Sequence, residues 1–344
     1  MPVIISSTSE LIASIPALFK FVPRDSLVLV SIVAQLDAPP APSPAMRVDL
    51  AAAEQDPASS INPWLTQLSD LPVLAVTGIV VCHRTEEQDS LPVRSTVDTI
   101  LEILRQHGVP SLEVVHLPEF AAGARWRSYV DVDRTGILPD PTTTVAAATN
   151  TFAGFTVAAS REDLAARYTS ASDADRDRLR PLIAAAIRQS EQDQSQPAAA
   201  QDRIARADAA VRASERGVLP DDDLVIADLA ATFTTLEFRD AMLVEAENEP
   251  SAGAERLALH LWRLTPEPAA SHLIAIIAVH TYRHGDGAGA RIALEAARTG
   301  TPLVRLLSAC FARGIDPVLF SQFMHETSQE AREHLTTGAR RSDA

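Results

Sequence analysis

The hydrophobic pattern of the chain changes near residue 145, and this change constrains the fold more than any other feature. Before it, short apolar runs of strand length alternate with amphipathic segments. After it, apolar residues recur almost only at the spacing of three and four residues that is typical of helices. We therefore predict an α/β domain over residues 1–144, an all-helical region over 145–334 and a flexible tail over 335–344.

Several apolar runs in the first region predict strands. They are Val3–Ser6, Leu27–Val33, Met46–Ala51, Val73–Cys82 and Leu112–Leu117. A continuous apolar run is typical of a strand that is covered on both faces, as in parallel sheets. Because segments of helical spacing at 9–21 and 93–107 alternate with these runs, we predict a mostly parallel sheet with flanking helices. The proline-rich piece Asp37–Pro44 is predicted to be an exposed loop.

The end of the second region has the pattern of paired helices. Segments of helical spacing are separated by short breaks at Gly285–Gly289 and Gly300–Pro302. Small residues such as Ala278, Ala290 and Ala293 recur where neighbouring helices must approach closely. This pattern predicts a helical bundle whose last helices form tetratricopeptide-like hairpins, although no second copy follows at a fixed period.

Composition and charge argue against several classes of function. Hydrophobic residues make up 46% of the chain, which is enough for a folded core, and the net charge of −15 opposes binding to nucleic acid. No run of 18 apolar residues predicts a membrane span, and the N-terminus lacks the positive region of a signal peptide. Two distant cysteines, Cys82 and Cys310, predict buried free thiols and a cytoplasmic protein.

Polar side chains follow the predicted strands at their carboxyl ends, where ligands of open α/β sheets bind. Asp49, His83, Arg84, His116 and Glu119 would converge into a ligand pocket if their strands were adjacent and parallel. Histidines after strands are also common as surface or capping residues, and both interpretations stay open. No spacing that is diagnostic of a metal site joins these residues, so we predict neither a metal nor a cofactor.

The segment Arg125–Tyr129 combines guanidinium groups with two of the chain's few large aromatic residues. Arg125, Trp126, Arg127 and Tyr129 are candidates for a surface that stacks on a ligand and binds its phosphate. The same alternation fits a short edge strand or hairpin, with Trp126 and Ser128 on one face and Arg127 and Tyr129 on the other.

The turn before the most apolar strand consists of Pro23, Arg24, Asp25 and Ser26. Arg24 could hold an anion there, whereas proline fixes the turn and Asp or Ser caps it through nearby backbone N–H groups. In a parallel sheet this turn lies at the amino end of its strand, away from the usual ligand site. We therefore predict a structural signature.

Two histidines in the helical region, His280 and His284, are four residues apart and share one helix face. No glutamate stands between them in the pattern of zinc proteases, and Gly285 ends the helix directly. The following Gly285–Gly289 comes after a helix instead of a strand, so it predicts a tight turn between helices and no phosphate loop.

Several segments together resemble a known family. They are "IPALFKFVPRDSLVLVSI", "RVDL", "RWRSYVDVDRTGILPD", "SREDLAARY" and "YRHGDGAGARIALEAARTGTPLVRLL". In this order they resemble the actinobacterial family described as domain of unknown function 4192. The chain departs from that family at Lys20, where members usually have glycine, and in "VDVDRTG", which lacks the cysteines that often follow the Ser-Tyr segment. The resemblance implies no activity and brings no catalytic residues.

Two functions remain open at this level. The first is a non-enzymatic adaptor or regulatory protein whose helical half binds a protein partner, with self-association as a weaker variant. The alternative is an enzyme or small-ligand sensor with a pocket at the carboxyl edge of the sheet. The position of the polar residues at that edge distinguishes the two functions. Residues that line a pocket favour the enzyme or sensor, whereas residues scattered over the surface argue against it.

Overall fold

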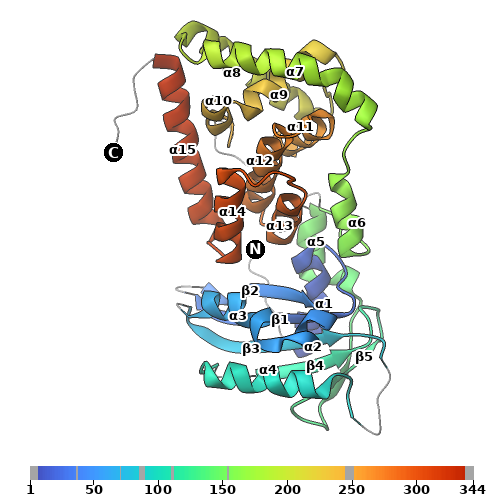
Figure 1. The fold of residues 1–344 in the computed structure, drawn as a ribbon. Coiled ribbons are helices and arrows are strands. Elements are labelled where there is room, and N and C mark those ends of the chain that lie inside the picture. Colours follow the sequence, from blue (N-terminus) through green and yellow to red (C-terminus); the bar gives the residue numbers. More distant parts are fainter. Residues whose placement is uncertain are drawn as a thin grey trace. The chain divides into compact units, whose positions relative to one another are not determined.

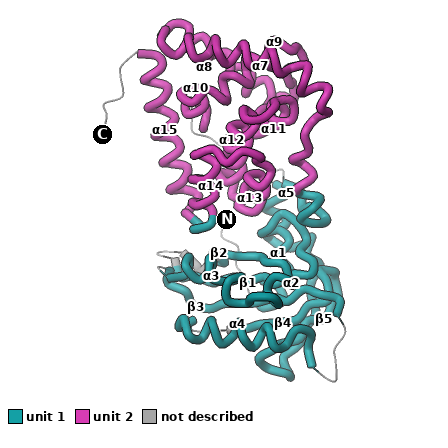
Figure 2. The backbone as a smooth tube through the Cα atoms, in the orientation of Figure 1, with its two compact units in different colours: residues 1–164, 312–314 teal, residues 165–311, 315–344 magenta. Residues whose placement is uncertain are grey.

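In a computed structural model the chain divides into two compact units (Figure 2). One unit comprises residues 1–164 and 312–314, and the other comprises 165–311 and 315–344. The structure describes residues 7–35, 38–69, 71–84, 90–109, 112–152, 155–244 and 252–337. The predicted strand Val3–Ser6 and residues 338–344 of the predicted tail lie outside the described residues.

The first unit is built on a six-stranded sheet with the order β2-β1-β3-β4-β5-β6 (Figure 1). Its strands are β1 (Ser26–Gln35), β2 (Ala38–Asp49), β3 (Val73–Val81), β4 (Leu112–Leu117), β5 (Arg125–Ser128) and β6 (Thr135–Ile137). Strands β3 and β4 run parallel, whereas each of the other neighbouring pairs is antiparallel. The α/β character of this unit is confirmed, but the predicted mostly parallel sheet is wrong.

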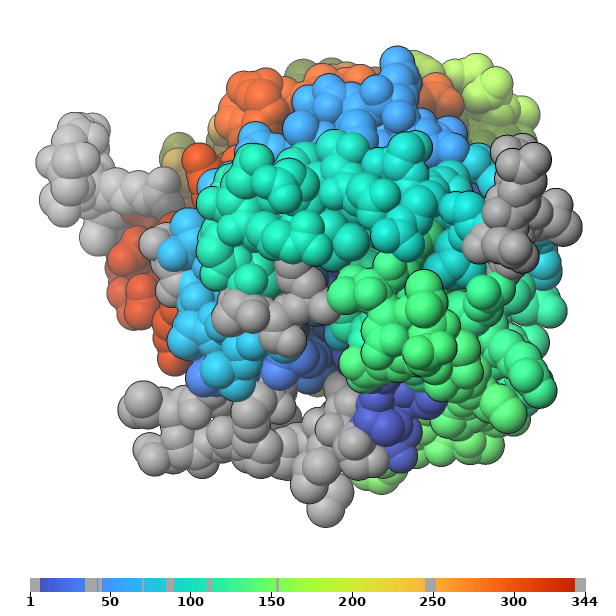
Figure 3. Space-filling model, turned by 90° about the horizontal axis from the view of Figure 1, so that it is seen from below, coloured from blue at the N-terminus to red at the C-terminus, as the bar shows by residue number. Residues whose placement is uncertain are grey.

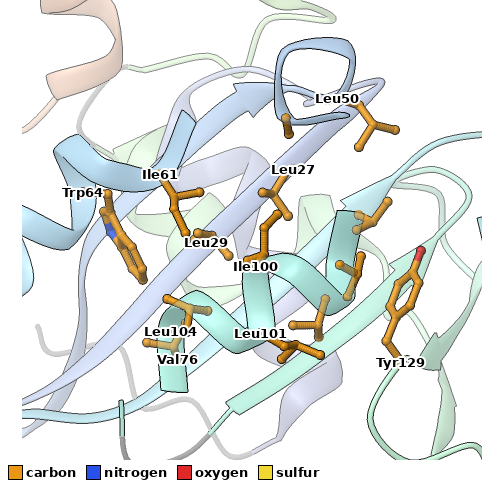
Figure 4. Close-up of a cluster of buried hydrophobic side chains, with 14 of the residues drawn as sticks. Leu27, Leu29, Leu50, Ile61, Trp64, Val76, Ile100, Leu101, Leu104 and Tyr129 are labelled. Carbon is orange, nitrogen blue, oxygen red and sulfur yellow. The ribbon is translucent and has the colours of Figure 1, made fainter. Parts of the chain in front are cut away.

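The strands are apolar because both faces of the sheet are covered, and this does not depend on whether neighbouring strands run parallel or antiparallel. Leu27 and Leu29 pack on one face against α3 (Pro57–Leu68) and α4 (Arg94–Gln106), as Figure 4 shows. Val28 and Val30 alternate with them and are also fully buried, because the opposite face is covered as well. Helix α1 (Thr8–Phe19) lies on that face, where its Ser9 accepts a hydrogen bond from the Trp126 indole. In Figure 3 the teal atoms of α4 form a continuous outer layer on the first unit.

Strand β2 replaces most of the predicted loop Asp37–Pro44. Asp37 lies outside the described residues, and the strand begins at Ala38. Pro42 pairs with Ile32 of β1, between two shifts of register. Proline is tolerated here because β2 is an edge strand, so its outer side needs no backbone donor.

Shorter elements complete the first unit. They are α2 (Leu50–Gln55), the 3-10 turn η1 (Pro141–Thr143), α5 (Val145–Phe152) and α6 (Arg161–Ala165), the last of which ends at the boundary of the unit. After α5 the chain returns to the end of α1, where the Ala158 N–H donates to Lys20 C=O at 2.8 Å.

Lys20, the residue at which the family resemblance breaks, closes α1 in the left-handed conformation with φ of 61°. This conformation suits glycine and is strained for other residues. The buried ammonium group of Lys20 donates to Asn150 Oδ1 and lies 4.5 Å from the centre of the Phe155 ring. These contacts fix the Lys20 side chain inside the first unit.

The second unit is helical. Its elements are η2 (Ala166–Tyr168), α7 (Asp173–Asp193), α8 (Pro197–Glu215), α9 (Asp223–Thr234), α10 (Leu236–Ala241), α11 (Ala252–Leu264), α12 (Ala270–Arg283), α13 (Gly287–Glu295), α14 (Pro302–Ala312) and α15 (Pro317–Thr337). The last residue of α14, Ala312, is assigned to the first unit. Every residue of α12 except His272 is buried, so α12 is the central helix of the bundle.

Candidate functional site

The antiparallel β1 brings the Pro23–Ser26 turn to the edge of the sheet where three other strands end. Ser26 pairs with Asp49 of β2 on one side and with Val81 of β3 on the other, and Val81 pairs with Leu117 of β4. We expected this turn at the opposite end of the sheet from the candidate pocket, because we assumed parallel strands. That expectation is wrong: the antiparallel register places the turn at the same end as the pocket residues.

The turn is held mainly by hydrogen bonds from the end of β2 and the start of α2. Asp25 has φ of 40°, and its backbone carbonyl accepts a bond of 2.8 Å from the Leu50 N–H. The Ser26 hydroxyl accepts a bond of 2.8 Å from Arg47 Nε, and Arg47 pairs with Asp49 at 2.7 Å. These bonds join the start of β1 to the end of β2 and support a structural role for the turn.

Beyond the end of β3, exposed polar side chains pair on the surface. Arg84 binds both oxygens of Glu54 on α2 at 2.5 and 2.9 Å. His83 Nε2 lies 3.6 Å from Glu119 Oε2, with both side chains exposed. Exposed pairs of this kind contribute roughly 0–1 kcal/mol to stability, and their side chains are accessible to a ligand.

His116 and Cys82 lie beneath these pairs. His116 is buried and its Nε2 lies 3.0 Å from the Cys82 carbonyl oxygen, which ties β4 to the end of β3. Burial raises the pKa of the Cys82 thiol, so the thiol stays protonated at neutral pH. Cys310, by contrast, is only half-buried.

The segment Arg125–Tyr129 does not present its aromatic rings to a ligand. Trp126 and Tyr129 are buried, and the Tyr129 hydroxyl donates to the Pro92 carbonyl at 2.6 Å. Arg125 and Arg127 are exposed on β5, which forms a hairpin with β6. Trp126 and Ser128 are both buried, as expected for one face of a short strand.

The structure therefore brings together only part of the predicted set. Asp49, His83, Arg84, His116 and Glu119 share one edge with the Pro23–Ser26 turn, whereas the rings of Trp126 and Tyr129 belong to the core. Within the described ranges, no three His, Cys, Asp or Glu side chains are arranged to hold a metal ion. In the same ranges no helix has both the length and the apolar surface that a bilayer span requires.

A second polar cluster, in the helical unit, was not predicted. It surrounds Glu255 of α11, whose carboxylate lies 3.0 Å from Arg167 Nη2 and 3.6 Å from His284 Nδ1. His280, one turn before His284, is buried and helps to lower the pKa of the Glu255 carboxylate electrostatically. Burial raises the pKa of Glu255, but the neighbouring His284 imidazole and the charge of Arg167 outweigh it and hold this pKa below its usual value.

The Gly285–Gly289 turn closes this cluster. Asp286 is buried and caps α13 by accepting from the Gly289 N–H at 2.8 Å. A side chain at Gly289 would clash with this carboxylate, because a Cβ atom would lie 2.3 Å from Asp286 Oδ2. A turn between helices is present as predicted, but it ends at Asp286, and Gly287–Gly289 already belong to the first turn of α13.

Tyr168 covers the cluster from the segment before α7. Its ring packs edge-on against Trp262 with ring centres 6.4 Å apart, and its hydroxyl lies 3.5 Å from the Gly289 carbonyl oxygen. Burial raises the pKa of Tyr168 to about 12. Two of the segments quoted for the family resemblance, "SREDLAARY" and "YRHGDGAGAR", thus meet around Glu255.

Comparison with known proteins identifies a family and nothing more specific. No curated protein and no solved structure matches the chain. A family model described as domain of unknown function (DUF4192) matches residues 9–318, which is nearly the whole chain. The chain therefore belongs to the DUF4192 family.

Proposed function

We propose that the protein is a non-enzymatic adaptor or regulatory protein that binds a protein partner through its helical unit. The observation that carries this proposal is a set of exposed apolar side chains on α14 and α15. Leu306, Val318, Leu319 and Phe323 are 51%, 65%, 63% and 57% exposed. We call these four residues the hairpin surface.

The fold does not require these side chains to be apolar. The inner sides of the same helices are fixed by aromatic packing: Phe311 stacks on Tyr282 with ring centres 4.1 Å apart, and Phe320 meets both rings edge-on. Leu319 and Phe323 are one helical turn apart and alternate with the buried Phe320 and Met324. An apolar stripe outside a completed core is the surface that a partner helix uses.

The hairpin character of these helices also supports the proposal. Paired helices of the tetratricopeptide-like kind present side chains from successive helices to one ligand. We further propose a cytoplasmic location, which two free thiols favour. A second copy of the chain is the simplest alternative partner, and the mass in solution distinguishes the two.

The test is a double substitution of the hairpin surface, Leu319→Asp with Phe323→Asp. We expect the doubly substituted protein to fold and to lose at least about tenfold in partner recovered from a lysate of its host, since each aspartate places a charge in a desolvated contact. Val132→Asp with Ile137→Asp, on exposed positions of the first unit, is the matched control. Equal recovery of the same partner by both variants contradicts the proposal.

A small-ligand site at the sheet edge is the second candidate. It is favoured by the convergence of the β1 turn with the ends of β2, β3 and β4. Native mass spectrometry of the purified protein tests it: a bound small molecule that His83→Ala with Arg84→Ala releases would support this site. A ligand that both substitutions leave in place would count against it.

A further inference from the structure

The segment between α6 and α7 is held on the helical unit by contacts with residues far away in sequence. Arg167 bonds to Glu255 at 3.0 Å, and Arg263 Nη2 donates to the Arg167 carbonyl at 2.9 Å. The Ala171 N–H donates to the Arg263 carbonyl at 3.0 Å. Residues Ala166–Ala171 therefore run along α11 as a strap.

The strap has little regular structure of its own. Only Ala166–Tyr168 form a single 3-10 turn, and the following residues up to Ser172 are irregular. A segment without an internal ladder of hydrogen bonds keeps its place only through its anchors. The Arg167 side chain is anchored on Glu255, and the backbone of the strap is anchored on Arg263 near the other end of α11.

The strap also covers groups that proteins seldom bury. Glu255 and His284 are largely buried, and His280 and Asp286 are almost completely so. Tyr168 packs over them against Trp262. Lifting the strap would expose the Glu255 carboxylate and the aromatic face of Trp262 together.

We propose that Ala166–Ala171 is a strap that opens while the bundle stays folded, and that the Arg167–Glu255 ion pair is its clasp. The reason is that few contacts fix the strap, whereas the helix beneath it is packed on all sides. The strap is fixed by one ion pair, a few hydrogen bonds and one ring, whereas α12 beneath it is buried at every position except His272. Opening the strap separates the rings of Tyr168 and Trp262 but leaves the packing around α12 in place, so it is a local event that precedes global unfolding.

Hydrogen exchange of the backbone amides tests the proposal in the full-length protein. In Glu255→Gln the amides of 166–171 should exchange at least about tenfold faster than in the wild type, since hydrogen bonds to charged groups contribute roughly that factor or more. The amides in the middle of α12 should be unchanged. Trypsin cleavage after Arg167 should accelerate in parallel, because the peptide bond must leave its docked position to be cut.

Two further variants keep the test decisive. Arg167→Gln breaks the clasp from its half-exposed side and should open the strap even if Glu255→Gln disturbs folding. Asp177→Asn removes an exposed ion pair with Arg180 on α7 and should change nothing in the strap. The proposal is overturned if 166–171 exchanges at the wild-type rate in both clasp variants, or if α12 accelerates as much as the strap does.

Discussion

At the scale of single residues, Lys20 shows how one side chain can replace what a family usually obtains from glycine. The backbone at this position is left-handed, and the sole lysine of the chain occupies it. Its ammonium group reaches Asn150 and the face of Phe155, two residues that follow it by more than a hundred positions. Sequence alone marks the departure from glycine, but the compensating contacts become visible only in the fold.

Substitution of Lys20 separates the cost of its left-handed backbone from the stabilisation by its side-chain contacts. Lys20→Gly and Lys20→Ala both lose the ammonium contacts, but only glycine relieves the left-handed conformation. We expect Lys20→Gly to be more stable than Lys20→Ala by about 1 kcal/mol in urea unfolding. An alanine variant as stable as the glycine variant would show that the backbone is unstrained.

His272 gives the protein a dependence of stability on pH. Burial lowers the pKa of His272, and the positive charge of Arg239, whose Nη1 lies 3.1 Å from Nδ1, lowers it further. The unfolded chain binds a proton near pH 6.5, whereas the folded chain resists it until lower pH. Stability is therefore lost as the pH falls below about 6.5.

His272→Gln should weaken this loss. The measurement is the free energy of unfolding in urea at pH 7.5 and 5.5, with the wild type as reference. We expect a smaller difference between the two pH values in the variant. An unchanged difference would mean that His272 does not carry the dependence.

At the scale of elements, one buried guanidinium ties three helices together. Arg203 of α8 is 2% exposed and lies 2.8 Å from Asp193 of α7 and 2.7 Å from Asp228 of α9. Burial raises the pKa of Asp193, but hydrogen bonds from Gln189 and Arg203 outweigh it and lower this pKa. The network fixes the mutual register of α7, α8 and α9.

Arg203→Met tests this network against a control on the same aspartate. The substitution leaves two carboxylates without their shared cation, and we expect a loss of about 3–5 kcal/mol in the free energy of unfolding. Arg206 also pairs with Asp228, at 3.1 Å, but its side chain is 53% exposed. Arg206→Gln should therefore cost less than about 1 kcal/mol. Similar losses in both variants would contradict the account of the network.

The strands themselves were predictable, but their directions were not. The apolar runs at Leu27–Val33 and Val73–Cys82 are strands that are covered on both faces over most of their length, although Leu74 near the start of β3 is exposed. Nothing in such a run records which way its neighbour runs. The prolines before Met46 also point to a loop, and only the place of β2 at the edge of the sheet makes a strand possible there.

At the scale of the whole molecule, the candidate sites were predictable only in part. The ends of β2, β3 and β4 meet as expected, because these three strands run in the same direction. The turn before β1 joins them only through an antiparallel pairing that the sequence does not encode. The Glu255 cluster depends on side chains more than eighty positions apart, such as Arg167 and Glu255. Its signal in the sequence was the pair His280 and His284, followed by Asp286, after the otherwise apolar stretch of α12.

The most direct test of partner binding compares the two candidate surfaces in living cells. A photo-reactive amino acid is placed at Phe323 of the hairpin surface in one protein and at His83 of the sheet edge in another. Our account predicts a protein adduct of defined mass on irradiation of the Phe323 variant, and none at His83. Adducts at His83 with none at Phe323 would contradict the claim that the helical unit binds the partner.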